Sequence, residues 1–165
     1  MIDRLILVAG RSRYRRNTVI KNVIERMQKV NTVFVPIGNW ERDDSLSYGD
    51  GIKWMIESFR YLDKPKSTLI VVEDIVPLFD TPEGYLLHLL FDLYSKKGVK
   101  FIIGTSLVSS DYLTPYFRSL CSTVISTRVN SEMQSKLLFG TRGAESLEDG
   151  EYLIKRKGKT TKGTI

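Results

Sequence analysis

The sequence is poor in residues that bind metals or form disulfides. It has one cysteine, Cys121, and one histidine, His88, among 165 residues. A single cysteine excludes a disulfide within the chain, and one cysteine with one histidine cannot supply the ligands of a structural zinc site. We therefore expect no metal centre and a reducing, cytoplasmic environment. A Ser-His-Asp hydrolase would depend on His88 alone, and we expect that residue on an ordinary helix surface.

Long apolar runs are also missing. None approaches the roughly 20 residues of a membrane-spanning helix, and Asp3 and Arg4 interrupt any resemblance to a signal peptide. We therefore expect no membrane partner. A hydrophobic content of 42% and a length of 165 residues predict one globular domain, residues 1–165. The net charge of +6 favours an anionic partner without identifying it.

Apolar segments alternate with helical patterns along the chain. We expect strands at 5–9, 32–36, 67–72, 99–105 and 123–127. Helices are expected from the first loop to about residue 27 and at 52–61, 84–96 and 131–139. We also expect a short helix or turn in 111–120, a loop at 38–51 and one or two edge strands after 151. Strands that are apolar throughout and alternate with amphipathic helices predict an α/β fold, a mainly parallel sheet with helices on both faces.

A glycine-led loop joins the first predicted strand to the first helix. Strand, loop and helix in this order are typical of the phosphate-binding P-loop, G-x-x-x-x-G-K-[ST], in which glycines let backbone amides face the phosphates. Gly10 stands at the first glycine position, whereas Arg15, Arg16 and Asn17 stand at the second glycine, the lysine and the Ser/Thr. We interpret these as degenerate nucleotide-binding residues. A simpler role for Asn17 is to cap the helix.

Polar residues also follow the third and fourth predicted strands. Glu73 and Asp74 stand where a Walker B element carries an Asp for Mg²⁺ and a Glu that polarises water, here in reversed order. Thr105 and Ser106 stand where a motor senses the γ-phosphate. The carboxyl ends of parallel strands share one edge, so these residues should converge with Gly10. The alternative is that each pair only ends its strand and caps the next turn.

Basic residues form two groups that are candidates for contacting a DNA backbone. The first lies in the loop after Gly10, and the second lies in a basic C-terminal segment, residues 151–165. The candidate residues are Arg11, Arg13, Lys155, Arg156, Lys157 and Lys159. Solvated surface explains the loop group equally well, and for the C-terminal segment it is the favoured interpretation.

Two longer segments carry a family resemblance. KKGVKFIIGTSLVSSDYLT (96–114) and CSTVISTRVNSEMQSKLLFGTRGAESLEDGEYL (121–153) resemble the motor domain of the FtsK/SpoIIIE DNA translocases, in the FtsK–HerA group of RecA-like ATPases. The GAESL segment, 143–147, is the most specific of these matches. The resemblance implies a RecA-like P-loop NTPase fold. It also implies ATP and Mg²⁺ as cofactors of an active site, and a hexameric ring around duplex DNA.

Carried over position by position, the resemblance implies a decayed site. Arg16 and Asn17 stand where the family has Lys and Ser/Thr, and Glu73 with Asp74 stands on its Asp-Glu pair. Ser106 stands on its Gln. Val124 and Lys136 stand on arginines of the family.

Three functions remain open on these residues. The first is a FtsK-like domain, suited to a phage or mobile element, that has lost ATP hydrolysis and binds DNA or assembles with a ring or a partner motor. The second is a divergent but active DNA translocase or packaging ATPase, with Arg16 replacing the lysine. The third is a protein-interaction module that holds a peptide in the former nucleotide pocket.

Overall fold

A computed structural model describes residues 4–27 and 32–165. In these residues one seven-stranded sheet has the order β2-β3-β4-β1-β5-β6-β7. The five strands from β2 to β5 in this order run parallel, and β6 and β7 add an antiparallel hairpin beside β5. The strands are β1 (Leu5–Ala9), β2 (Val33–Ile37), β3 (Thr68–Val72), β4 (Lys100–Thr105), β5 (Thr123–Ser126), β6 (Glu151–Arg156) and β7 (Lys159–Thr164).

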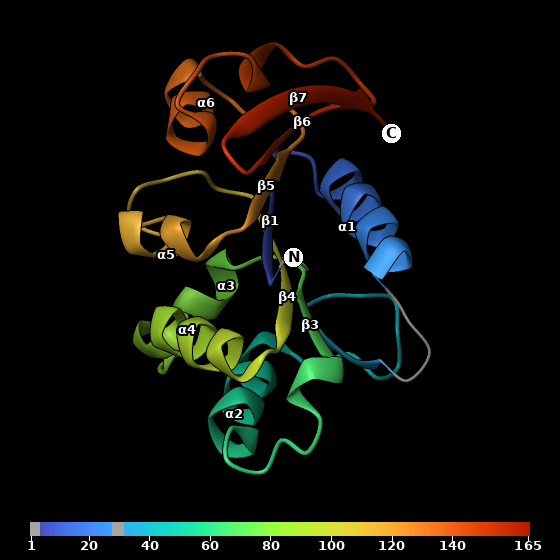
Figure 1. Ribbon diagram of the computed structural model, residues 1–165, viewed down its shortest axis with the longest axis vertical. Coiled ribbons are helices and arrows are strands. Elements are labelled where there is room, and N and C mark those ends of the chain that lie inside the picture. Colours follow the sequence, from blue (N-terminus) through green and yellow to red (C-terminus); the bar gives the residue numbers. More distant parts are fainter. Residues whose placement is uncertain (1–3, 28–31) are drawn as a thin grey trace.

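Helices cover both faces of this sheet, as the sequence predicts. Helix α1 packs on one face, against β1 and β4, and most other helices lie on the opposite face (Figure 1). The α-helices are α1 (Arg13–Met27), α2 (Tyr48–Ser58), α3 (Val76–Phe79), α4 (Leu87–Lys97), α5 (Pro115–Leu120) and α6 (Glu132–Phe139). Short 3-10 turns span Pro65–Ser67, Gly84–Leu86 and Ala144–Ser146. No helix in the described ranges is long and apolar enough to cross a membrane.

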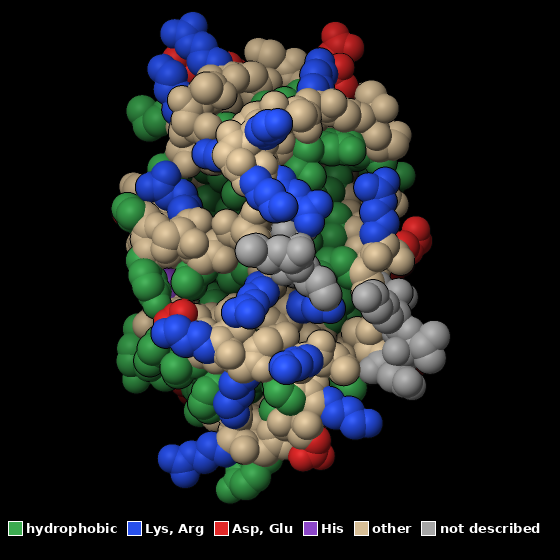
Figure 2. Space-filling model, viewed as in Figure 1, with side chains coloured by type: hydrophobic (Ala, Val, Ile, Leu, Met, Phe, Trp, Pro, Cys, Tyr) green, Lys and Arg blue, Asp and Glu red, His purple; other side chains and the backbone are tan. Residues whose placement is uncertain are grey.

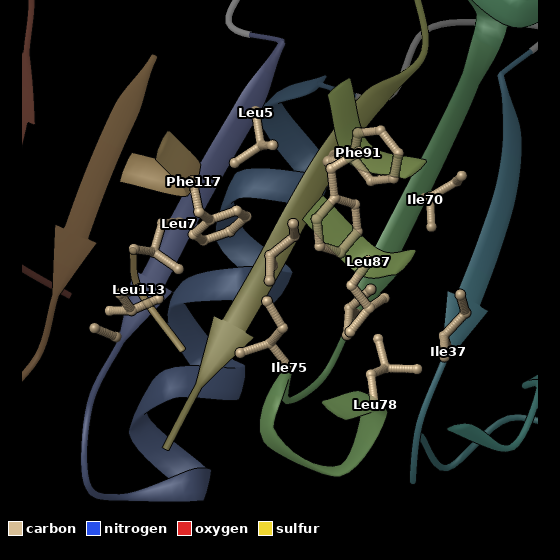
Figure 3. Packing of buried hydrophobic residues seen from close by; sticks show 14 of the residues in the cluster. Leu5, Leu7, Ile37, Ile70, Ile75, Leu78, Leu87, Phe91, Leu113 and Phe117 are labelled. Atoms are coloured by element: carbon tan, nitrogen blue, oxygen red, sulfur yellow. The ribbon is translucent and has the colours of Figure 1, made fainter. Parts of the chain in front are cut away.

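Strand β1 explains why the sheet is buried on both sides. Alternate side chains of a strand point to opposite faces. Leu5 and Leu7 join the larger core cluster, which Figure 3 shows with Phe91 of α4 and Phe117 of α5, whereas Val8 joins the smaller cluster beneath α1. All five residues of β1 are buried. An uninterrupted apolar strand is therefore required at the centre of the sheet.

Several element boundaries differ from the sequence-based expectation. Helix α2 begins at Tyr48, inside the expected loop, because the Ser47 side chain caps it by accepting a hydrogen bond from the Asp50 amide. Helix α3 was not expected; it is a single turn between β3 and α4. The expected helix in 111–120 is limited to Pro115–Leu120, where the Thr114 side chain accepts a hydrogen bond from the Phe117 amide.

The interpretation of His88 as ordinary helix surface is wrong. Its ring is half-buried, stacked on Phe117 and edge-on to Phe79. Its Nε2 lies 3.1 Å from the carbonyl oxygen of Tyr112. Burial lowers the pKa of His88, and the Tyr112 carbonyl only partly opposes that shift. The residue therefore packs between helices rather than facing solvent.

Substitution of Gly104 should destabilise the protein. A Cβ at Gly104 in β4 would lie 2.0 Å from the carbonyl oxygen of Glu73, so the ends of β3 and β4 would have to separate. We expect Gly104→Ala to cost about 2–4 kcal/mol of unfolding free energy in urea titrations. Gly49→Ala is the matched control, because nothing lies within 4 Å of its Cβ position in α2. A neutral Gly104→Ala would contradict this close packing.

Candidate functional site

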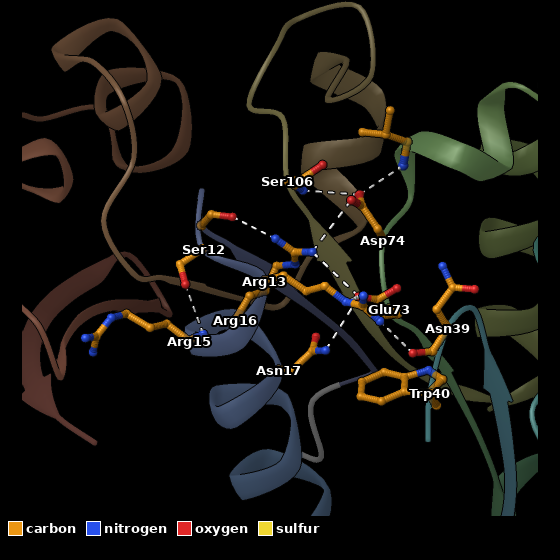
Figure 4. Close-up of polar contacts among 12 residues, drawn as sticks. Ser12, Arg13, Arg15, Arg16, Asn17, Asn39, Trp40, Glu73, Asp74 and Ser106 are labelled. Atoms are coloured by element: carbon orange, nitrogen blue, oxygen red, sulfur yellow. Dashed lines mark hydrogen bonds and ion pairs between the residues drawn. The ribbon is translucent and has the colours of Figure 1, made fainter. Parts of the chain in front are cut away.

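Three strands bring the polar residues singled out in the sequence to one edge of the sheet. At the carboxyl end of β1, the Gly10 amide donates to the carbonyl of Thr105, 3.2 Å away. The Ser106 amide donates to Asp74 Oδ1 at 3.1 Å, which joins the ends of β4 and β3. The predicted convergence of Gly10, the acidic pair and Thr105-Ser106 is therefore confirmed. The first turns of α1 cover this cluster (Figure 4).

The loop between β1 and α1 is shorter than a P-loop requires. It consists of Gly10, Arg11 and Ser12, and α1 already begins at Arg13. Ser12 caps the helix, since its carbonyl accepts from the Arg16 amide at 3.0 Å and its Oγ accepts from the Arg15 amide at 3.4 Å. The expectation that Asn17 caps the helix is thus wrong. The amides of Arg15 and Arg16 are used within the helix and do not turn towards a ligand.

The side chain of Arg16 lies inside this edge of the sheet, only 2% exposed. Its Nη1 donates to the Gly10 carbonyl at 2.9 Å. Its Nη2 lies 3.6 Å from Asp74 Oδ2 and 3.9 Å from Glu73 Oε1. A buried guanidinium needs such anionic partners, because an unpaired buried charge is strongly destabilising. Arg16 therefore supplies the positive charge between the two carboxylates.

Glu73 is the most connected side chain of the cluster. Its Oε1 accepts from Arg13 Nε at 2.6 Å and from Asn17 Nδ2 at 3.5 Å, and its Oε2 accepts from the Tyr48 hydroxyl at 2.7 Å. Burial alone would raise the pKa of Glu73, but the hydrogen bonds from Tyr48 and Arg13, the Arg13 charge and the Asn17 amide together lower it. Burial, followed by the hydrogen bond to Glu73, raises the pKa of Tyr48. At neutral pH, Tyr48 is therefore a protonated donor to an ionised Glu73.

Asp74 and Thr105 also have local structural partners. Asp74 Oδ1 accepts from the Val76 amide at 3.2 Å as well as from Ser106, so it caps the turn into α3. The Thr105 hydroxyl is buried and donates to the Leu107 carbonyl at 2.8 Å. Ser106 is exposed. The simpler interpretation, that these residues end strands and cap turns, accounts for the contacts of Asp74 and Thr105.

The residues present do not fit a magnesium ion or a triphosphate. Mg²⁺ needs oxygen ligands at about 2.0–2.1 Å, usually including several waters, but the Arg16 guanidinium already lies between the two carboxylates. The amides of Arg15 and Arg16 are occupied by Ser12. Within the described parts of the chain, no group of three or more His, Cys, Asp or Glu side chains could hold a metal ion.

The two predicted groups of DNA-contacting residues lie at opposite ends of the sheet. Arg11 and Arg13 are at the carboxyl end of β1, and Arg13 is already engaged by Glu73 and by the Asn39 carbonyl at 2.7 Å. Because β6 runs antiparallel to β5, Arg156 pairs with Thr123 at the amino end. The four C-terminal candidates therefore cannot form one surface with the loop arginines.

Sequence reasoning missed Tyr48 and the groove beside the cluster. Tyr48 lies in a polar, glycine-containing segment that favoured a loop, and only the Ser47 capping signal could have placed it on a helix. The groove has a volume of about 750 Å³ and separates α1 from the segment after β2. It is lined by Arg13 and Asn17 of α1, by Phe34 of β2, and by Trp40 and its neighbours after β2.

Comparisons with known proteins were made by sequence and by structure. No family model and no curated protein matches the sequence. Solved structures do match. The pCW3 conjugation coupling protein TcpA, in its monomer form with ATPγS, superimposes with a TM-score of 0.75 over 98% of this chain at 13% identity. The genome packaging NTPase B204 of Sulfolobus turreted icosahedral virus 2, with ATPγS, gives a TM-score of 0.66 over 97% at 12% identity.

This chain shares the fold of P-loop NTPases. The cytoplasmic domain of the type VII secretion ATPase EccC from Thermomonospora curvata also matches, with a TM-score of 0.71 over 97% of the chain at 14% identity. The neighbours are FtsK/HerA-type motor domains, so the resemblance seen in the sequence is confirmed at the level of fold. The chain spans 59% of TcpA and 25% of EccC, but 96% of B204.

Removing the Arg16 charge should destabilise the fold strongly. Arg16→Met keeps much of the side-chain volume but leaves Glu73 and Asp74 without their buried cation. We expect a loss of about 3–5 kcal/mol in unfolding free energy, measured by chemical denaturation. Arg13→Gln is the comparison, since Arg13 is 58% exposed, and it should cost about 1 kcal/mol or less. Equal effects would contradict a special role for the buried guanidinium.

The pH dependence of stability should report the ionisation of Glu73. Its pKa is lower in the folded state than in the unfolded chain, so its contribution is present above the unfolded value and is lost as pH falls through the folded value. Tyr48→Phe removes one hydrogen bond that lowers this pKa. We expect the acid limb of Tm against pH to move to higher pH. Tyr61→Phe, at a residue 78% exposed, should leave it in place.

Proposed function

We propose that this chain, residues 1–165, is a FtsK/HerA-like motor domain that does not hydrolyse ATP and serves as a DNA-binding or assembly module. One observation carries the proposal: the Arg16 guanidinium occupies the space between Glu73 and Asp74. In an active P-loop ATPase, an acidic residue at this position binds the magnesium ion. The active alternative, with Arg16 as a phosphate ligand, requires this side chain to point towards the loop opening. Its contacts instead run inward, to the Gly10 carbonyl and both acids.

Binding of MgATP would have an energetic cost here. Arg16 would have to leave both carboxylates, and the first turn of α1 would have to unwind to free the amides held by Ser12. Breaking a buried ion pair costs about 3–5 kcal/mol. A cost of about 3 kcal/mol alone would weaken nucleotide binding by more than a hundredfold. We therefore propose that the module needs neither ATP nor Mg²⁺.

The proposed association with DNA is supported by charge and by the nature of the structural neighbours. The net charge of +6 favours a polyanionic partner. Among the neighbours are a conjugation coupling protein and a genome packaging NTPase. We propose that the module acts in the cytoplasm, bound to DNA within a homo-oligomeric ring or beside a partner motor, and that it derives from a phage or mobile element.

A peptide-binding role is the second candidate, and the groove beside the cluster favours it. The lining of the groove combines the aromatic side chains of Phe34 and Trp40 with charged side chains. Arg42 lies 4.7 Å from the centre of the Phe34 ring, and the Trp40 indole donates to the Ile37 carbonyl at 3.1 Å. An extended peptide with one apolar side chain would fit such a lining.

Nucleotide should neither bind tightly nor turn over. A ligand present at a hundred times its Kd stabilises a protein by about 2.7 kcal/mol. We therefore expect no rise in Tm with 1 mM ATP and Mg²⁺, and no phosphate release above the blank, with or without duplex DNA. ATP turnover that Asp74→Asn abolishes would overturn the proposal. Arg128→Gln, at an exposed residue after β5, is the control for any change in Tm caused by mutation alone.

A further inference from the structure

The edge of the sheet opposite Arg16, Glu73 and Asp74, which we name the Arg16 cluster, carries a second basic group. The parallel strands β3, β4 and β1 begin there, and the turn between β6 and β7 reaches the same edge because Arg156 pairs with both Thr123 and Lys159. Five cations lie along it, and we name them the amino-edge band: Lys66 before β3, Lys100 at the start of β4, Arg4 before β1, and Lys157 and Lys159 around the hairpin turn.

No acid among the described residues compensates the side chains of the amino-edge band. Within the described residues, none of the five takes part in an ion pair or a side-chain hydrogen bond. Four are exposed and Lys100 is half-buried. Lys96, Lys136 and Lys162, in contrast, each pair with an acid. Figure 2 shows Lys and Arg side chains gathered down the middle of one face, with the visible acids towards its margins.

A basic pocket adjoins the hairpin end of this band. It has a volume of about 430 Å³ and is lined by Arg118, Lys136, Lys155 and Lys157, over apolar side chains that include Leu7. Arg118 Nη1 donates to the Leu137 carbonyl at 2.9 Å, but its buried Nε has no hydrogen-bond partner in the described structure. A buried donor without a partner is costly. Lys136 also pairs with Glu132, but the lining itself contains four cations and no acid, so the pocket is complementary to an anionic group.

The backbone at Lys157 adds an independent observation. Lys157 has φ of 51° and Gly158 has φ of 77°, so both central residues of the β6–β7 turn are left-handed. Such turns favour Asn-Gly or Asp-Gly, and a lysine in the first position is strained. Among the described residues, Lys157 is the only one other than glycine with positive φ. The turn therefore carries a positive charge at the expense of local stability.

We propose that the amino-edge band binds the phosphate backbone of duplex DNA, on the side of the sheet opposite the Arg16 cluster. From β3 to β7 the band crosses five strand spacings, about 24 Å in all. Duplex DNA presents one phosphate charge per about 1.7 Å of its axis, so a run of this length faces all five cations. The proposal rests on the proposed association with DNA but not on the loss of ATP hydrolysis.

Fluorescence anisotropy with a labelled 30-base-pair DNA duplex tests whether DNA binds at the amino-edge band. The band variant combines Lys100→Gln, Lys157→Gln and Lys159→Gln. The control removes the same charge elsewhere, through Lys21→Gln, Lys53→Gln and Arg128→Gln, all exposed residues. We expect the band variant to lose at least about tenfold in affinity, and the slope of log K against log salt to become shallower by about 2–3. The control should lose less than about threefold.

A single substitution distinguishes an effect on DNA binding from an effect on the stability of the fold. Lys157→Asn relieves the strained turn position, so Tm should stay constant or rise, while DNA affinity falls. Absence of DNA binding by the unaltered protein at 50 mM salt would overturn the proposal, as would equal losses in the band and control variants. Neither result depends on ATP turnover, so a failure here is distinguishable from a failure of the proposed inactive nucleotide site.

Discussion

The carboxyl edge of the sheet depends on one interaction, the burial of the Arg16 guanidinium between Glu73 and Asp74. This contact ties α1 to the end of β3, and the Arg16 bond to the Gly10 carbonyl extends it to β1. Two buried carboxylates without a cation would repel each other and lose solvation. The charge of Arg16 compensates both carboxylates from within the chain. The Tyr48 hydroxyl completes the arrangement from α2.

Close backbone packing makes this arrangement possible, and the glycines at this edge serve that packing. A Cβ at Gly10 would lie 2.0 Å from Thr127 Oγ1, so Gly10 allows β1 to pass β5 closely. Gly38, with φ of 115°, would place a Cβ 2.9 Å from that of Glu73. In a P-loop, glycine serves the approach of phosphate to the backbone. Here the same residue type lets neighbouring strand ends and side chains approach one another.

The sheet was predictable from the sequence because its central strands are apolar along their whole length, as in 5–9 and 99–105. The edge at which Gly10, Glu73 and Ser106 meet follows from that topology. The direction of the Arg16 side chain was not predictable, because an arginine at a P-loop lysine position can point out towards phosphate or inward towards acids. The choice depends on where α1 begins, which Ser12 sets through capping. Tyr48 was not predicted as a site residue for the same reason, because Ser47 caps the start of α2 within a segment that the sequence predicts to be a loop.

The two edges of the sheet differ in whether their basic side chains form ion pairs with acids. At the carboxyl edge, the charges of Arg13 and Arg16 are matched by Glu73 and Asp74, and Arg11 is the exposed cation beside them. At the amino edge, the reversed direction of β6 brings the hairpin lysines beside the starts of β4 and β1, and no acid of the described residues pairs with them. The net charge of +6 is therefore distributed unevenly. Uncompensated charge attracts polyanions over about a Debye length, so this difference between the two edges supports the proposed DNA-binding surface at the amino edge.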